Sequence, residues 1–242
     1  MNNHYDETDF FDKYSQMTRS KEGLAGAGEW RTLRRLLPDF DKKTVLDLGC
    51  GYGWHCKYAA DHGAKQVIGV DLSEKMLAEA AKRNADPKID YRQGDILEAA
   101  FPADTFDIVF SSLAFHYLPD WTAMVKQVAS YLKSGGTFLF SVEHPVFTAA
   151  GNQQWDYDEQ GEIRHFPVDR YFYEGVRQAD FLGETVEKYH RTLTTYVETL
   201  LQNGFSIEHL VEPTPPEDLL SVPGMVDELR RPMMLIISAK KK

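Results

Sequence analysis

From Thr44 onward, short apolar runs alternate with stretches whose apolar residues recur at helical spacing. This alternation is typical of successive strand and helix units that build a mainly parallel sheet. The sequence therefore predicts an α/β fold with helices on both faces of the sheet. The expected strands are residues 44–48, 66–71, 89–93, 106–110, 137–142, 205–211 and 231–239.

Two of the expected helices have well-defined starts. Ser73 is a candidate N-cap, and Leu72 and Leu77 stand at the positions of a hydrophobic staple around it. Asp120 is the candidate N-cap of a later helix, whose apolar residues continue to Leu132. We expect the last helix to end at the Asn-Gly pair that begins with residue 203.

Two parts of the chain lie outside this alternation, which otherwise fits a single domain over residues 1–242. Residues 1–40 hold two helical patterns before the first strand. Residues 144–188 form an aromatic-rich insertion after the fifth strand, which we interpret as a cap over a site. The alternative for this insertion is a hairpin that only packs on the sheet edge.

Composition and charge narrow the class of protein. Of 242 residues, 43% are hydrophobic and 26% are charged, as in globular proteins. The net charge of −10 opposes binding to a phosphate backbone, so nucleic acid is not the expected substrate. The two cysteines, Cys50 and Cys56, are not spaced as a Cys-x-x-Cys pair. With no secretory leader and no membrane-length apolar run, we expect a cytoplasmic protein outside the membrane.

The residues with the clearest chemistry lie in the segment Val-Leu-Asp-Leu-Gly-Cys-Gly-Tyr-Gly, residues 45–53, where a strand runs into a glycine-rich turn at a helix start. Glycine permits the positive φ of such a turn and close approach of a ligand to the backbone. The free N–H groups of the helix start add a partial positive charge. The candidate binding residues in this segment are Asp47, Gly49, Cys50, Gly51 and Gly53.

An acidic residue, Asp71, ends the second strand 22 positions after Gly49. There its carboxylate can accept hydrogen bonds from both ribose hydroxyls of a nucleoside. A dinucleotide fingerprint would need a further glycine after Gly53, but Trp54 stands there. The pattern therefore favours a nucleoside cofactor without a pyrophosphate over a nicotinamide dinucleotide.

Over roughly residues 40 to 140, the sequence resembles the class I S-adenosylmethionine-dependent methyltransferases, in particular a small-molecule branch similar to the ubiquinone and menaquinone biosynthesis enzymes. The resemblance implies S-adenosylmethionine as cofactor and a Rossmann-like seven-stranded sheet in the order 3-2-1-4-5-7-6, with the last strand antiparallel. It also implies that the three glycines wrap the methionine part and that Asp71 binds the ribose. The remaining implied contacts are Leu72 beside the adenine, Asp95 and Ile96 at the adenine edge, and Ser111 near the amino group and sulfonium.

Some of these residues also have an ordinary structural explanation. Asp95 could be a turn residue, and Asp47 could simply bond the backbone of the glycine turn. In the N-terminal segment, Tyr14 and Arg19 would suit a sulfonium and a carboxylate, although a packed helix explains them nearly as well. The Ser-Ser-Leu-Ala stretch that begins at Ser111 lacks the Pro-Pro-Tyr of enzymes that methylate base amino groups. The expected partner is therefore a small-molecule methyl acceptor.

A sulfonium is an activated methyl donor, so alignment and exclusion of water are the main tasks and a base is optional. The candidate bases at strand ends are His116, His144 and His190, together with Glu143. We single out no metal ligands. Two other functions stay open, a non-catalytic S-adenosylmethionine-binding regulatory protein and a nicotinamide-dependent oxidoreductase. The sequence leaves open the acceptor, the methylated atom and the oligomeric state.

Overall fold

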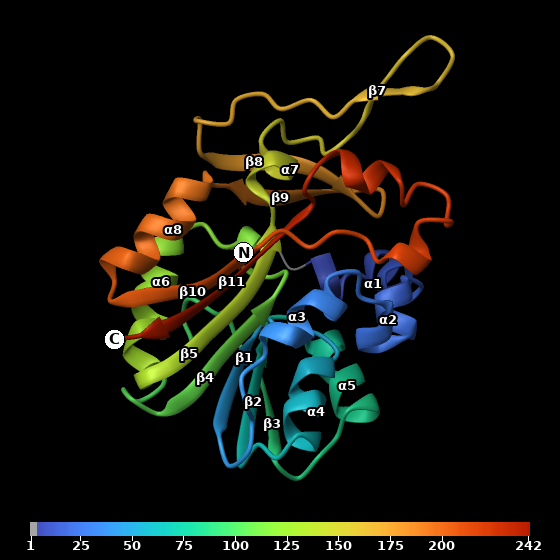
Figure 1. The fold of residues 1–242 in the computed structure, drawn as a ribbon. Helices are drawn as coiled ribbons and strands as arrows, with labels where there is room; N and C mark the ends of the chain where they lie inside the picture. Colours follow the sequence, from blue (N-terminus) through green and yellow to red (C-terminus); the bar gives the residue numbers. More distant parts are fainter. Residues whose placement is uncertain (1–3) are drawn as a thin grey trace.

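A computed structural model describes residues 4–242; residues 1–3 of the expected N-terminal segment lie outside the described residues. Its central feature is a seven-stranded sheet in the order β10-β11-β5-β4-β1-β2-β3 (Figure 1). β11 is antiparallel to both of its neighbours, and the other neighbouring pairs are parallel. The predicted fold class and strand order are thus confirmed. The strands are β1 (Thr44–Leu48), β2 (Gln66–Asp71), β3 (Ile89–Gln93), β4 (Phe106–Ser112), β5 (Leu132–Glu143), β10 (Phe205–Val211) and β11 (Met234–Lys241).

Helices cover both faces of this sheet, which is why its central strands are apolar almost throughout (Figure 1). One face is covered by α3 (Trp30–Leu36), α4 (Trp54–Asp61) and α5 (Glu74–Arg83), and the other by α6 (Trp121–Tyr131) and α8 (Leu193–Gln202). The largest core cluster lies under α6 and α8 and contains rings such as Phe138 and Phe140 from β5.

The two predicted helix starts are confirmed by their caps. The Ser73 hydroxyl accepts a hydrogen bond from the Met76 N–H over 3.1 Å, and Asp120 accepts one from the Ala123 N–H over 2.8 Å. The Asp6 carboxylate also reaches the start of α5, where it accepts from the Ser73 hydroxyl over 2.5 Å. Asp6 belongs to η1 (His4–Asp6), which precedes α1 (Thr8–Ser15), α2 (Thr18–Lys21) and η2 (Gly23–Gly26). The N-terminal segment is therefore fastened to the helix that follows β2.

Some element boundaries differ from those predicted. β5 begins at Leu132 rather than at residue 137, because its first residues pair with β4 across an irregular register. The last strand begins at Met234 rather than at residue 231, because residues 212–233 form an irregular segment with η4 (Glu217–Leu219) and η5 (Asp227–Arg230). Pattern alone gave no sign of this irregular segment beside the insertion.

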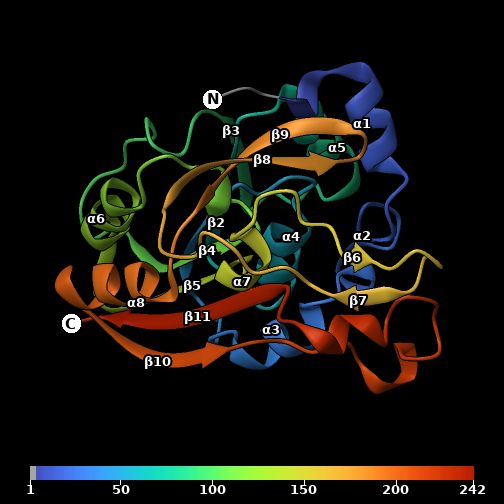
Figure 2. The same cartoon turned by 90° about the horizontal axis from the view of Figure 1, so that it is seen from above.

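The insertion, residues 144–188, lies beyond the carboxyl ends of the parallel strands (Figure 1). It holds α7 (Pro145–Thr148) and two hairpins, β6 (Asp156–Tyr157) with β7 (Ile163–His165), and β8 (Gly175–Phe181) with β9 (Glu184–His190), whose last strand ends just after it. Figure 2 shows the β8–β9 hairpin crossing above the sheet, with β6 and β7 beside the 212–233 segment.

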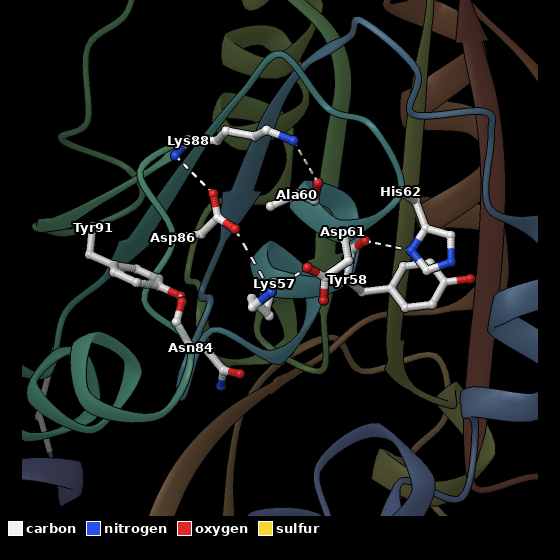
Figure 3. Close-up of polar contacts among 9 residues, drawn as sticks. All are labelled: Lys57, Tyr58, Ala60, Asp61, His62, Asn84, Asp86, Lys88 and Tyr91. Atoms are coloured by element: carbon white, nitrogen blue, oxygen red, sulfur yellow. Dashed lines mark hydrogen bonds and ion pairs between the residues drawn. The ribbon is translucent and has the colours of Figure 1, made fainter.

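Polar contacts fasten α4 to the loop before β3 (Figure 3). The Lys57 ammonium lies 3.8 Å from Asp86, and the Lys88 ammonium donates to the Ala60 carbonyl over 3.1 Å. These contacts hold the helix that follows the glycine-rich turn against the loop before β3. Within residues 4–242, no helix has the length and apolar character needed to span a membrane.

Candidate active site

A cavity of about 580 Å³ lies between the carboxyl ends of the strands, the N-terminal segment and the β8–β9 hairpin. Its volume is in the range of small-molecule binding pockets, roughly 300–1,000 Å³. One end is lined by the glycine-rich turn and the ends of β2 and β3. The other end is lined by the insertion, by η3 (Phe115–Tyr117) and by the beginning of β11. The cavity thus joins two chemically different halves.

The glycines of the turn have different tasks. Gly49, Gly51 and Gly53 all have positive φ. A Cβ on Gly49 would lie 2.4 Å from the Cβ of Ala114, so Gly49 permits close packing of the turn on the segment after β4. A Cβ on Gly51 would meet only open space, and Gly51 lines the cavity. The backbone at Gly51 is therefore bare toward the cavity, as a ligand cradle requires.

Asp71 stands beside this bare backbone at the end of β2 and lines the cavity. Its carboxylate accepts from the Gly51 N–H over 2.7 Å and from the Ser73 N–H over 3.0 Å. Burial raises the pKa of Asp71, although the two N–H groups act against that shift. Each oxygen keeps a further lone pair, so the carboxylate can still accept hydrogen bonds from two adjacent hydroxyls.

The neighbouring wall comes from the loops after β2 and β3, where Leu72, Asp95 and Ile96 line the cavity. Asp95 accepts from the Leu97 N–H over 2.8 Å and so shapes its own loop. Asp95 therefore builds a turn and also borders the cavity, so the two alternatives considered for it are compatible. An apolar wall interrupted by a carboxylate suits a flat base with an amino group.

Asp47 and Cys50 do not line the cavity, because both side chains point into the sheet under the turn. Asp47 is buried and accepts from the Cys56 thiol over 3.3 Å. Burial raises its pKa to about 7. Cys50 packs in the apolar cluster around Cys56, where Gly69 leaves room for both sulfur atoms. These two residues support the turn from below and are not placed to touch a ligand with their side chains.

Two other candidates also lie outside the cavity lining. Ser111 is buried and donates to the Leu48 carbonyl over 2.7 Å, and strand alternation turns the next residue, Ser112, to the cavity instead. A Cβ on Gly53 would lie 2.1 Å from the Tyr91 hydroxyl oxygen, so Gly53 serves packing against β3. The role expected for Ser111 near the amino group and sulfonium therefore stays a prediction.

β4 ends in an unusual backbone conformation at the cavity. Leu113 lines the cavity with φ of +54°, a left-handed conformation that a leucine rarely adopts. Its N–H donates to the Ser141 carbonyl over 2.9 Å, which holds it in place. Such strained residues are often found at functional sites.

Tyr14 and Arg19 of the N-terminal segment line the cavity. They border its glycine half, the end formed by the glycine-rich turn. Arg19 lies 3.2 Å from a carboxylate oxygen of Glu29, and the Ser112 hydroxyl donates to the same oxygen over 3.1 Å. Glu29 is almost fully buried and was not singled out in the sequence. The pair fixes the guanidinium against the cavity wall, where it can bind an anion.

The structure separates the three candidate histidines. His116, in η3, lines the cavity, whereas His144 and His190 do not. His190 is buried with both ring nitrogens engaged, Nδ1 at 2.7 Å from the Thr148 hydroxyl and Nε2 at 2.8 Å from the Tyr171 carbonyl. It therefore holds the insertion together and has no free nitrogen for a ligand.

His144 caps α7 and points away from the cavity. Its Nδ1 accepts from the Val146 N–H over 3.0 Å, and its Nε2 lies 2.8 Å from a carboxylate oxygen of Glu212. Burial lowers the pKa of His144, while the Glu212 carboxylate opposes that shift. The residue thus connects the insertion to the 212–233 segment.

A polar cluster lies in the second half of the cavity, formed by Glu143, Gln153 and Lys188. The Lys188 ammonium donates to Glu143 Oε1 over 2.6 Å and to Gln153 Oε1 over 3.0 Å, and the Gln153 amide donates to Glu143 Oε2 over 2.6 Å. Burial alone would raise the pKa of Glu143, but His116, the Lys188 ammonium and these hydrogen bonds bring it below its ordinary value. The cluster is a hydrogen-bonded group of paired charges at the cavity wall.

Sequence reasoning found Glu143 but missed Lys188 and Gln153. A signal for Lys188 was present, because in β9 it shares the inward face with Val186 and His190. Gln153 lies in an irregular stretch with no periodicity. In residues 4–242, no group of three histidine, cysteine or acidic side chains is arranged to hold a metal ion.

Comparison with known proteins is consistent with this geometry. Residues 46–140 match the family described as methyltransferase domain. A candidate S-adenosylmethionine-dependent methyltransferase from Listeria monocytogenes is 56% identical, with a TM-score of 0.87, over 91% of this chain and 99% of that one. An S-adenosylmethionine-dependent methyltransferase from Mesorhizobium loti is 43% identical, with a TM-score of 0.84, over 90% and 100%. A ubiquinone biosynthesis O-methyltransferase from Coxiella burnetii is 37% identical over 44% of this chain and 46% of its own length.

Proposed function

This chain belongs to the S-adenosylmethionine-dependent methyltransferases, and from that premise we propose that it methylates a small molecule held in the cavity under the insertion. The protein is an enzyme whose cofactor, S-adenosylmethionine, supplies a methyl group activated by a positively charged sulfur. The observation that carries the proposal is the continuity of the cavity. One space joins the bare backbone at Gly51 to the aromatic end beneath the β8–β9 hairpin.

The glycine half of the cavity has the groups that the cofactor needs. We assign the ribose hydroxyls to Asp71 and the adenine to the wall of Leu72, Asp95 and Ile96. The methionine part then lies along Gly51, with its carboxylate near the guanidinium of Arg19. Gly49, Gly53, Asp47, Cys50 and Ser111 act indirectly, by holding the turn and the end of β4 in place.

The other half has the properties of an acceptor site for a small molecule. Its walls include aromatic and thioether side chains, and polar groups from Glu143, Gln153 and Lys188 form a cluster among them. A net charge of −10 does not favour a nucleic-acid substrate. The Coxiella burnetii relative is named for an O-methylation, but the chain spans less than half of its length, so it supports an oxygen acceptor only by analogy.

The chain's own residues would act mainly by alignment and by exclusion of water. Tyr14 closes the cofactor half from the N-terminal side, and the β8–β9 hairpin closes the acceptor half. Within that enclosure, His116 presents a neutral ring and the Glu143–Lys188 pair presents fixed dipoles. Such preorganised groups orient an acceptor without having to move when the reaction occurs.

The two other functions considered for the sequence gain nothing from these comparisons. A dinucleotide fingerprint has glycine where this chain has Trp54, whose ring packs against Gly23 of the N-terminal segment. A Cβ on Gly23 would lie 3.0 Å from that ring. A polar and aromatic acceptor half is also more than a cofactor-binding regulator needs. Methyl transfer therefore explains both halves of the cavity.

A labelling experiment tests the proposal. The purified protein is incubated with methyl-labelled S-adenosylmethionine and a cell extract, which is then separated into small-molecule, protein and nucleic-acid fractions. We expect label in the small-molecule fraction, and clearly less of it at a limiting cofactor concentration when Asp71→Ala replaces the wild type. Label confined to protein or nucleic acid, or none in any fraction, would contradict the proposal.

A further inference from the structure

We propose that the acceptor half of the cavity binds an ionised oxygen acid, a carboxylate or a phenolate on an apolar body, through the buried ammonium of Lys188. The proposal rests on the methyl-transfer function above and adds the chemical class of the acceptor. Its starting point is the position of Lys188, which lines the cavity although its side chain is only 2% exposed. Lysine is rarely buried to this extent without a specific reason.

Lys188 has a donor to spare. An ammonium carries three N–H groups, and the bonds to Glu143 and Gln153 use two of them. Both acceptors come from the wall of the cavity, so the side chain is held in one place, and within residues 4–242 the third N–H forms no hydrogen bond. A ligand oxygen at that point would complete the coordination of the ammonium.

The neighbouring polar groups also offer hydrogen-bond donors. The Gln153 amide has a second N–H besides the one given to Glu143. His116 Nδ1 accepts from the Glu143 main-chain N–H over 3.4 Å, which leaves the proton of the neutral ring on Nε2. Glu143 accepts one 2.6 Å bond on each oxygen, and its negative charge is paired with the Lys188 ammonium. Donors converging on one place select a ligand group that accepts.

The buried charges favour an anion. Glu143 and Lys188 neutralise each other, and Arg191 adds a further positive charge beside η3. Arg191 is 5% exposed and donates to the carbonyls of Phe115 and Leu118, and within residues 4–242 it forms no ion pair with a carboxylate. Its uncompensated charge lies in a poorly solvated region, where it acts over several ångströms.

Two carboxylates on the β8–β9 hairpin also line the cavity, and their effect is weaker. Asp180 and Glu187 occupy exposed positions of β8 and β9. Water and salt screen exposed charges, whereas buried charges are screened much less. The buried positive charge is therefore the stronger influence on a ligand inside the cavity.

The remaining walls describe the body of the acceptor. The rings of Phe181 and Tyr117 lie 5.3 and 5.9 Å from the Lys188 ammonium. Phe147, Tyr189 and Met233 continue the apolar lining. A flat or branched apolar body can pack there while its charged oxygen meets Lys188. An oxygen that is already ionised has no proton to lose on methylation, so this site needs no general base.

The test compares small probes of opposite charge and similar shape. Binding of benzoate, of 4-nitrophenol at a pH where it is ionised, and of benzylamine is measured by ligand-observed NMR with the protein saturated in S-adenosylhomocysteine. We expect benzoate or the phenolate to bind and benzylamine not to bind; the better anion shows which of the two oxygen acids the site prefers. Preferential binding of benzylamine, or no selectivity among the probes, would overturn the proposal.

Variants then locate the binding group. Lys188→Met should weaken binding of the anionic probe about tenfold or more, and should shift preference toward benzylamine because Glu143 is left unpaired. The same substitution at Lys126, which is exposed on α6, serves as the matched control. Should Lys188→Met fail to fold, the double variant Glu143→Gln with Lys188→Met removes both charges together and should also lose the anion.

S-adenosylhomocysteine affinity is measured calorimetrically for every variant. A wild-type protein that binds no S-adenosylhomocysteine would contradict the methyl-transfer function itself. A folded double variant that keeps both S-adenosylhomocysteine and undiminished anion binding would overturn only the role given to Lys188.

Discussion

The main-chain N–H of Glu143 donates to Nδ1 of His116 over 3.4 Å. A ring nitrogen that accepts a hydrogen bond carries no proton, so the neutral ring of His116 is protonated at Nε2. Burial lowers the pKa of His116 to about 4. The Glu143 carboxylate acts against this shift, and the positive charges of Lys188 and Arg191 add to it. At neutral pH this histidine is therefore a hydrogen-bond donor to the cavity, although the sequence suggested a general base.

This lowered pKa predicts a pH-dependent stability. In the unfolded chain His116 takes up a proton near pH 6.5, but in the folded protein only near pH 4. The unfolded state binds more protons between these values, so the wild type loses stability relative to His116→Gln as the pH falls through that window. The difference should reach about 3 kcal/mol near pH 4. Urea unfolding of both proteins from pH 4 to pH 7 measures it, and parallel stability curves would contradict the buried neutral state.

Asp71 provides a prediction for the cofactor. Its carboxylate lines the cavity beside Gly51 and is the group that we assign to the ribose hydroxyls. Asp71→Ala should weaken S-adenosylhomocysteine binding by about 1.5–3 kcal/mol, because charge-assisted hydrogen bonds are lost. The exposed Asp90, changed in the same way, is the control and should leave affinity unchanged. Calorimetry that finds equal affinity in both variants would remove Asp71 from the cofactor site.

Gly51 and Gly53 should respond differently to the same substitution. Both have positive φ, so alanine costs each about 1 kcal/mol of folding stability. At Gly51 the new Cβ meets only open space, and we expect loss of cofactor binding with that modest cost. At Gly53 it meets the Tyr91 ring and hydroxyl, and we expect a further drop in the melting temperature.

Thermal unfolding and calorimetry on the two alanine variants separate these effects. Tyr91→Phe in the Gly53→Ala background removes the atom that would lie 2.1 Å away and should restore part of the lost stability. Equal melting temperatures for the two single variants would show that Gly53 is not a packing position.

The fold was predictable from sequence because its information is local. The apolar run of β2 and the capping residue Ser73 each report on a few neighbouring positions, and both were recognised correctly. The sheet order came from the resemblance to a family, since no local pattern specifies which strands pair. The start of β11 was misplaced because residues 212–233 have no periodicity of their own and are held by contacts with the insertion.

The candidate site was predictable only where backbone position decides which way a side chain points. Asp71 and Gly51 end a strand and form a turn, so sequence position alone brought them to the cavity. Of the adjacent Ser111 and Ser112, only Ser112 lines the cavity, and sequence alone cannot resolve which of two neighbouring serines strand alternation turns that way. His190 looked free because its partner Thr148 is distant in sequence, and such tertiary contacts leave no local trace.

Arg231 connects the 212–233 segment to the insertion. The guanidinium of Arg231 lies 4.6 to 5.0 Å from the rings of Phe147, Phe166 and Trp155, and the side chain is 5% exposed. A cation enclosed by aromatic faces away from water stabilises such a contact by about 2 kcal/mol or more. Because the neighbouring Met233 lines the cavity, this contact also holds part of the acceptor wall.

We therefore predict that Arg231→Ala allows the insertion to open more often, roughly thirtyfold if about 2 kcal/mol is lost. Arg231→Lys should give an intermediate result, because it keeps the charge but loses the planar group that stacks on the rings. Amide exchange over residues 145–166 measures the opening, with Arg35→Ala, at an exposed position of α3, as control. Bound S-adenosylhomocysteine and an anionic probe should slow the exchange if the insertion closes over the cavity. Exchange that is equally fast in the wild type and in Arg231→Ala would mean that the aromatic cage does not hold the insertion closed.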